Sequence, residues 1–277
     1  QYVSHSSAGS SWSVDWTPPT NVDSVTVYLA GLATSGTRQG NVYTSSVTFT
    51  KAPSAAATPK ITGVVNAASF AQGASPGSWL TIFGSNLAPA GVARSWTAAE
   101  LASGSLPTAL EGTSVRINGK SAYIAYVSEG QLNVLTPADD SRGNVAVEVS
   151  TAASGGTAAS ATTTISNASP GLFRFEPQNY LYVAAVHPDG TTNVPAKPGE
   201  IVLLFGTGFG AAGADVASGL SMRIGGVAAE VKYAGLISPG LYQFNVVVPA
   251  VADGDQRVEA SVGGSSVPTE QYLAVKQ

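Results

Sequence analysis

The feature that most constrains the fold is an internal repeat in the part of the chain beyond residue 60. Three pairs of blocks align in the same order: 75–84 with 197–206, 114–119 with 221–226, and 130–138 with 241–250. Each repeat is a little over 100 residues long, which is about the length of one ordinary domain. We therefore expect two copies of one domain, at residues 60–168 and 169–277.

The offset between the copies falls from 122 residues at Phe83 and Phe205 to 112 at Gln131 and Gln243. The extra residues of the first copy therefore lie between these positions. Thr97 and Glu100 in this stretch have the spacing of a reciprocal helix cap and precede Leu101. We expect a helix of one or two turns there and no other helix.

Apolar and polar residues alternate with period two at many places in the chain, for example at residues 24–29 and 145–149. This alternation is typical of half-buried strands. Turn-forming groups of Gly, Asn, Asp and Pro separate the strands, as at 117–120, 188–190 and 253–255. The pattern predicts an all-β protein made of tandem immunoglobulin-like sandwiches.

Composition narrows the functions that the chain can have. Only 11% of its residues are charged, and its net charge is −4, so nucleic acid is not an expected partner. The absence of cysteine excludes disulfides and thiolate metal sites, and no apolar run reaches the length of a membrane span. The chain starts with neither a Met nor a signal-peptide pattern, which predicts a mature or truncated product. Low charge and abundant Ser, Thr and Gly favour an extracellular location.

Residues 54–59 lack periodicity and end in a proline, so we interpret them as a linker. They separate the repeats from residues 1–53, which offer only about three strands, at 12–16, 24–29 and 41–50. Three strands are too few for an independent sandwich, and we interpret this segment as a partial β-domain.

Several motifs resemble known families. The turns Gly84-Ser85-Asn86-Leu87 and Gly206-Thr207-Gly208-Phe209 are similar to those of the IPT/TIG immunoglobulin-like fold. Together with the runs 65–70, 131–133, 169–173, 195–200 and 240–245, they resemble the two-repeat C-terminal domain of secreted acidobacterial proteins. This resemblance implies a sandwich fold and secretion, but no catalytic residues. The first fifty residues resemble the second half of a reeler-like domain.

Two stretches invite a catalytic or cofactor interpretation. Gly206-Thr207-Gly208-Phe209-Gly210-Ala211 nearly fits a dinucleotide fingerprint, but the residues after it are a poor helix start, and the first copy has a plain turn at the same place. The two histidines, His5 and His187, lack a plausible carboxylate and nucleophile for a hydrolytic triad. We therefore expect neither a cofactor nor enzymatic activity.

Metal and carbohydrate sites have only a few candidate residues. Two isolated histidines do not make a zinc or iron site. Calcium at the aspartates of two turns stays open, although Asp also favours turn geometry; these are Asp139 with Asp140, and Asp253 with Asp255. The acidic residues are dispersed, unlike the paired carboxylates of a glycosidase. Aromatic candidates for a carbohydrate platform are Trp79, Trp96, Tyr123, Tyr126, Tyr180 and Tyr182. Packing is the expected role of Trp79 and Tyr126.

The partial domain has an apolar face that needs a partner. Alternation places eight side chains on matching faces of its strands: Trp12, Val14, Trp16, Val25, Val27, Leu29, Val47 and Phe49. Burying them is worth at most about 12–24 kcal/mol before the entropy of ordering is subtracted. Either the segment folds back onto the first sandwich of its own chain, or its open edge pairs with a strand of a neighbouring molecule.

These observations predict an extracellular structural or adhesive subunit on a bacterial surface. Self-association through residues 1–53 would build a homopolymer such as a filament or appendage. The alternative is a carbohydrate-binding accessory module of a larger secreted enzyme. A row of exposed aromatic residues would favour the alternative, and an incomplete sheet would favour assembly.

Overall fold

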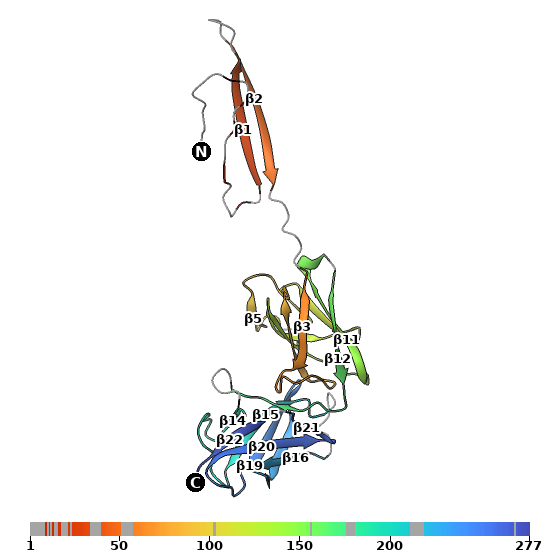
Figure 1. Ribbon diagram of the computed structural model, residues 1–277, viewed down its shortest axis with the longest axis vertical. Helices are drawn as coiled ribbons and strands as arrows, with labels where there is room; N and C mark the ends of the chain where they lie inside the picture. Colours follow the sequence, from red (N-terminus) through yellow and green to blue (C-terminus); the bar gives the residue numbers. More distant parts are fainter. Residues whose placement is uncertain are drawn as a thin grey trace. The chain divides into compact units, whose positions relative to one another are not determined.

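The computed structural model describes most of the chain: residues 9, 11, 13, 16–17, 22, 24–33, 40–50, 58–101, 104–155, 157–175, 181–210, 219–268 and 270–277. The chain divides into two compact units, Gln1–Ala55 and Ala56–Gln277. Strands dominate both, in agreement with the all-β prediction (Figure 1).

The first unit contains a two-stranded antiparallel sheet of β1 (Ser24–Ala33) and β2 (Asn41–Thr50). Val25 pairs with Phe49, and Val27 pairs with Val47. A strand was also predicted over 12–16, but Ser13 and Trp16, the described residues of that stretch, are not in a strand. Alternation gives side chains a common face without supplying a hydrogen-bonding neighbour, so it does not make a strand by itself.

The second unit begins with a sandwich of two antiparallel sheets, named here the first sandwich. One sheet has the order β3-β4-β10-β9-β5: β3 (Lys60–Asn66), β4 (Trp79–Ser85), β10 (Gln131–Leu135), β9 (Tyr123–Ser128) and β5 (Ala93–Ser95). The other has the order β12-β11-β7-β6, with β8 paired to β7: β12 (Ala159–Ile165), β11 (Gly143–Thr151), β7 (Thr113–Ile117), β6 (Ala109–Leu110) and β8 (Lys120–Ser121). The core lies between the sheets, where Leu80 and Ile82 face Val147 and Val149.

The second sandwich follows the same plan. One sheet has the order β13-β15-β19-β18, with β14 paired to β15: β13 (Gly171–Leu172), β15 (Ile201–Thr207), β19 (Leu241–Val247), β18 (Val231–Ser238) and β14 (Ala185–Val186). The other has the order β17-β16-β20-β21, with β22 paired to β20: β17 (Val227–Ala228), β16 (Ser221–Ile224), β20 (Gly254–Val262), β21 (Ser265–Ser266) and β22 (Gln271–Val275). Its core is separate and includes Val202, Leu204, Phe244 and Ile224.

The expected helix at Thr97 is reduced to a turn. The Glu100 carboxylate accepts a 2.7 Å hydrogen bond from the Thr97 backbone N–H, as the capping spacing predicts. Glu100 also binds the Arg94 guanidinium at 2.8 Å, and Arg94 reaches Glu111 as well. The bonds from Arg94 and from the Thr97 N–H lower the pKa of Glu100 to about 2. The one helical segment among the described residues is a 3₁₀ turn, Ala152–Ser154.

Hydrogen bonds and close packing join the two sandwiches. The Trp79 backbone N–H donates to Thr207 Oγ1 at 2.9 Å, and the Trp79 indole N–H donates to the Pro239 carbonyl oxygen at 2.9 Å. The Thr207 hydroxyl in turn donates to the Gly240 carbonyl oxygen at 2.7 Å. Trp79 was expected to pack in the core or between domains, and it makes these two bonds between the sandwiches.

Candidate functional site

A cleft with a volume of about 820 Å³ lies where the first sandwich meets the second. Its walls combine aromatic rings with neutral polar side chains and one cation. The lining residues are Ala67, Ala68, Phe70, Thr81, Phe83, Tyr126, Gln131, Asn133, Phe173 and Arg174. The volume is within the range of ordinary small-ligand sites, about 300–1,000 Å³.

The floor of the cleft is the outer face of one sheet of the first sandwich. On β4 and β10 alternate residues point into the core, so the residues between them point outward. Pairing brings Phe83 beside Gln131 and Thr81 beside Asn133. On the next strand Tyr126 pairs with Asn133. Sequence alternation therefore builds one outward patch from three neighbouring strands.

Hydrogen bonds fix the polar groups of this floor. Asn133 Oδ1 accepts from the Thr81 hydroxyl at 3.1 Å and from Gln131 Nε2 at 2.9 Å. Because that oxygen is engaged twice, the groups that the two amides can offer a ligand are Asn133 Nδ2, a donor, and Gln131 Oε1, an acceptor.

Phe70 forms one wall and has an unusual backbone. Its φ is 56°, in the left-handed region that bulky residues rarely adopt. The Asn66 side chain holds this turn, since its Oδ1 accepts from the backbone N–H groups of Ala68 and Ser69 at 2.8 and 3.0 Å. The Phe70 ring stacks on Phe83, with centroids 6.4 Å apart. With 41% of its surface exposed, Phe70 presents part of its side chain to the cleft.

The second sandwich contributes the opposite wall through Phe173 and Arg174. The Arg174 guanidinium lies 5.7 Å from the centre of the Phe70 ring, a cation–π arrangement. Its Nη2 also approaches the carbonyl oxygens of Ala68 and Ser69 at 3.4 and 3.3 Å. The cleft therefore exists only where both sandwiches are present.

Most of the aromatic residues predicted as a carbohydrate platform are elsewhere. The rings of Trp79 and Trp96 pack on each other with centroids 6.3 Å apart. Tyr182 forms a backbone bridge with Tyr272, and Tyr180 lies outside the described residues. Only Tyr126 lines the cleft. Sequence reasoning missed Phe70, Phe83 and Phe173, although outward alternation on 79–83 was a signal for Phe83.

The structure brings together most of the predicted assembly residues. Val25, Val27, Leu29, Val47 and Phe49 share one face of the β1–β2 hairpin, named here the hairpin face. Leu29 is 53% exposed and Phe49 is 59% exposed. Trp16 is also exposed, whereas Trp12 and Val14 lie outside the described residues.

His187 is buried and paired, which the sequence did not reveal. Its Nδ1 lies 2.7 Å from Glu200 Oε1, and its Nε2 lies 3.2 Å from the Val194 carbonyl oxygen. Burial raises the pKa of Glu200, but hydrogen bonds from His187 and from the Lys197 backbone N–H outweigh burial and hold that pKa below its usual value. His5 lies outside the described residues. The contacts of His187 link two loops, and neither partner is a nucleophile.

The glycine-rich loop after β15 packs against residues 169–171, at the start of the second sandwich. A Cβ atom on Gly206 would lie 2.6 Å from Phe209 Cε2 and 2.7 Å from the Gly171 carbonyl oxygen. Gly208 has a φ of 79°, and its carbonyl oxygen accepts from the Ser169 N–H at 2.9 Å. A Cβ atom on Gly208 would lie 2.7 Å from the Ser169 carbonyl carbon, so close packing and the turn account for glycine at both positions.

In each of the two aspartate turns, a carboxylate oxygen accepts a hydrogen bond from a backbone N–H. Asp139 Oδ1 accepts from the Ser141 N–H at 3.0 Å, and its Oδ2 lies 3.1 Å from Lys120 Nζ. Asp253 Oδ1 accepts from the Gln277 N–H at 2.9 Å. No group of three or more potential His, Cys, Asp or Glu ligands is gathered anywhere in the described ranges.

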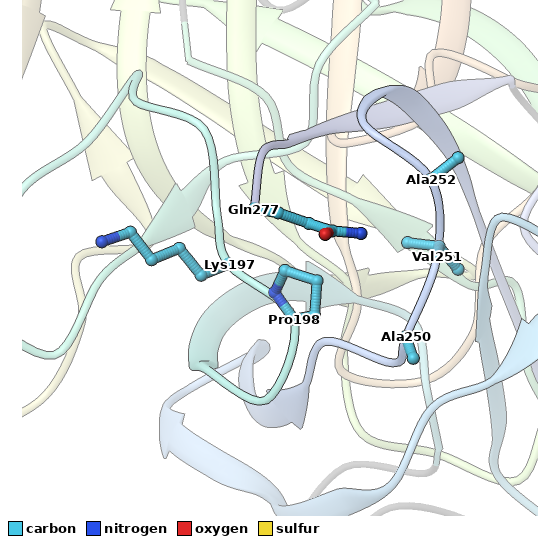
Figure 2. A pocket seen from close by; sticks show the side chains of 6 residues that line it. All are labelled: Lys197, Pro198, Ala250, Val251, Ala252 and Gln277. Atoms are coloured by element: carbon cyan, nitrogen blue, oxygen red, sulfur yellow. The ribbon is translucent and has the colours of Figure 1, made fainter.

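A second hollow, with a volume of about 560 Å³, lies at one end of the second sandwich. Figure 2 shows Gln277 between the loop of Lys197 and Pro198 and the loop that carries Ala250, Val251 and Ala252. The Lys197 side chain extends away from the other lining groups. With one cation and small apolar side chains, this hollow lacks an acid and base pair.

Residues 59–165 match the family described as IPT/TIG domain. This part of the chain is an IPT/TIG domain. It coincides with the first sandwich and contributes the floor of the cleft and the Phe70 wall. The predicted resemblance is confirmed for this domain.

Two solved structures are similar to the chain at low identity. SGBP-B of the Bacteroides ovatus mixed-linkage glucan utilization locus, solved in complex with a mixed-linkage heptasaccharide, is 16% identical, with a TM-score of 0.38; the match covers 91% of this chain and 53% of that chain. The Escherichia coli adhesin FdeC is 14% identical, with a TM-score of 0.26, over 91% of this chain and 74% of FdeC. The chain thus spans about half the length of the Bacteroides protein. No curated protein matches the sequence.

In the part of the chain that the structure describes, no helix is long and apolar enough to cross a bilayer.

Proposed function

We propose that the chain is an extracellular, non-catalytic structural or adhesive subunit that self-associates through the hairpin face. The observation that carries this proposal is the exposure of Leu29, Val47 and Phe49 on one side of a two-stranded sheet. Isolated two-stranded hairpins are marginally stable in water, and three or more strands with a packed face are usually needed. The hairpin therefore requires a partner.

A neighbouring copy supplies that partner most simply. The outer edges of β1 and β2 carry backbone groups that can pair with a strand of a second copy and so extend the sheet, and a layer of that copy packed on the sheet would cover the hairpin face. A head-to-tail contact of this kind grows into a filament unless its rotation closes a ring. The alternative is that residues 1–53 fold back onto the IPT/TIG domain of the same chain.

In this proposal residues 1–53 are a partial β-domain, 54–59 a linker, and 60–168 and 169–277 two repeats of one sandwich. The pairing of the sheets supports the repeat. Phe83 pairs with Gln131 in the first sandwich, and Phe205 pairs with Gln243 in the second. The resemblance of the repeats to a domain of secreted proteins, and of residues 1–53 to a reeler-like domain, supports a location on the bacterial surface in this proposal.

Truncation tests the proposal. Deletion of residues 1–53 leaves both sandwich cores intact and should give a soluble monomer, because the hairpin face is removed. The full chain should sediment as large assemblies in analytical ultracentrifugation, and electron micrographs of it should show filaments or rings. Equal monomeric behaviour of both proteins at high concentration would support folding back within one chain and exclude assembly.

A second function, binding of a surface carbohydrate, is favoured by one observation. The cleft between the sandwiches gathers four aromatic residues, Phe70, Phe83, Tyr126 and Phe173, around neutral amides. Binding to an insoluble polysaccharide in a pull-down assay tests this function independently of assembly.

A further inference from the structure

The chemistry of the cleft specifies a ligand more closely than a general carbohydrate function does. Its polar floor is neutral, since Thr81, Gln131 and Asn133 carry a hydroxyl and two amides. The lining includes no acidic residue, and its one cation, Arg174, is placed over the Phe70 ring. Such a surface suits uncharged hydroxyl groups better than phosphates or carboxylates.

The aromatic residues supply the complementary apolar contact. The Phe70 and Phe83 rings are stacked with 25° between their planes, so neighbouring ring faces are held at a fixed angle. A pyranose ring has one face of C–H groups and a rim of hydroxyls. It can therefore cover an aromatic face while its rim reaches the Asn133 and Gln131 amides. A purely apolar ligand would desolvate these amides without replacing their hydrogen bonds.

The position of the cleft argues against a peptide that adds a strand. The floor residues Thr81 and Phe83 are on β4, Gln131 and Asn133 on β10, and Tyr126 on β9. These strands are the inner ones of the order β3-β4-β10-β9-β5, so their backbone groups are already paired. Recognition by strand addition needs a free sheet edge, which the floor of the cleft does not offer.

The second sandwich repeats the pairings of this floor. Phe205 pairs with Gln243, Tyr233 pairs with Asn245, and Gln243 Nε2 donates to Asn245 Oδ1 at 2.8 Å. Leu203 replaces Thr81 beside the asparagine. Phe83 and Phe205 form one matched pair, and Asn133 and Asn245 form another, because the two residues of each pair occupy the same place in their own sheets. The second floor is therefore a control for the first.

We propose that the cleft of Phe70, Phe83, Gln131, Asn133 and Arg174 is a binding site for a neutral glycan of pyranose units. This inference deepens the second function proposed above and is independent of the hairpin face. The aromatic walls hold the C–H face of a sugar, and the amides select hydroxyl groups.

Calorimetry and affinity electrophoresis of the full chain test the site with soluble xyloglucan, mixed-linkage β-glucan and galactomannan, and with polygalacturonate as an anionic counterpart. The unaltered protein should bind at least one neutral polysaccharide, with little dependence on salt. Phe83→Ala should weaken binding about tenfold, and Asn133→Ala about two- to tenfold. The matched changes Phe205→Ala and Asn245→Ala should leave affinity unchanged.

Thermal melts show whether each variant is folded, and Asn133→Ala keeps the test decisive if Phe83→Ala is unstable. Three results would overturn the inference: no binding of any neutral polysaccharide, salt-sensitive binding of polygalacturonate alone, or equal losses in both members of a matched pair. Equal losses combined with retained binding in the pull-down would leave carbohydrate binding standing and move its site elsewhere. A hairpin variant that binds normally would separate this site from assembly.

Discussion

Asn66 Nδ2 donates a 2.8 Å hydrogen bond to the carbonyl oxygen of Ser169. This bond links the end of β3 to the segment just before β13, the first strand of the second sandwich. The same side chain accepts from two backbone N–H groups through Oδ1, and only 1% of its surface is exposed. One amide thus holds the Phe70 turn and the junction of the sandwiches together.

Replacement of this amide should loosen the junction. Asn66→Ala leaves buried backbone donors and one acceptor without partners, which should lower the free energy of unfolding by on the order of 3 kcal/mol. Chemical denaturation measures the loss. Asn144→Ala is the control, because Asn144 is exposed and makes one side-chain bond to Thr164. Equal stability of the two variants would contradict the role of Asn66.

Gly206 should tolerate no side chain. A Cβ atom there would lie within 2.7 Å of Phe209 and of the Gly171 carbonyl oxygen, so Gly206→Ala should cost about 1–3 kcal/mol through overpacking. Gly63→Ala is the comparison, since its Cβ would be 4.0 Å from the nearest atom, on Phe83. Calorimetric titration with NAD should show no binding to the unaltered protein. Measurable NAD affinity would overturn the interpretation of this loop as a turn.

The contact between His187 and Glu200 predicts a pH dependence. Because the pKa of Glu200 is lowered by folding, its contribution to stability is complete above its ordinary pKa of 4.5 and is lost as the pH falls through the folded value. Glu200→Gln should be less stable than the parent protein at pH 7, by about 1.5–3 kcal/mol. Melting curves from pH 7 to pH 3 should show this difference shrinking below about pH 4.5. A difference that stays constant would show that the carboxylate charge is unimportant.

Chelators should leave the fold intact. The Asp139 carboxylate accepts from the Ser141 N–H in its own loop and pairs with Lys120, and the Asp253 carboxylate accepts from the Gln277 N–H. Burial raises the pKa of Asp139, but the bonds from Ser141 and Lys120 lower it further than burial raises it. Melting temperatures with EDTA and with added calcium should agree. A shift of more than a few degrees would mean that one of these turns holds calcium.

Local patterns predicted what depends on local spacing. Period-two alternation located the hairpin strands, and the Thr97–Glu100 spacing gave the capping bond seen in the turn. The structure has a turn there and not a helix, and Arg94 from β5 also holds the Glu100 carboxylate.

The cleft could not be predicted in this way. Phe70 and Arg174 are about a hundred positions apart, and nothing in either neighbourhood indicates that the rings and the guanidinium meet. The left-handed backbone of Phe70 depends on three hydrogen bonds to Asn66, one of them from the Phe70 N–H itself. His187 and Glu200 were likewise separated by a loop whose path the sequence does not specify.

Sedimentation of two single variants of the full chain tests self-association through the hairpin face most directly. Val47 and Ser46 are neighbours on β2 with opposite orientations, and Val47 faces Val27 whereas Ser46 faces Tyr28. Val47→Asp places a charge on the hairpin face and should convert the assemblies to monomers, because an unpaired carboxylate is costly to bury. Ser46→Asp should sediment as the unaltered protein does. Assemblies that survive Val47→Asp, or that are lost equally in both variants, would contradict assembly through this face.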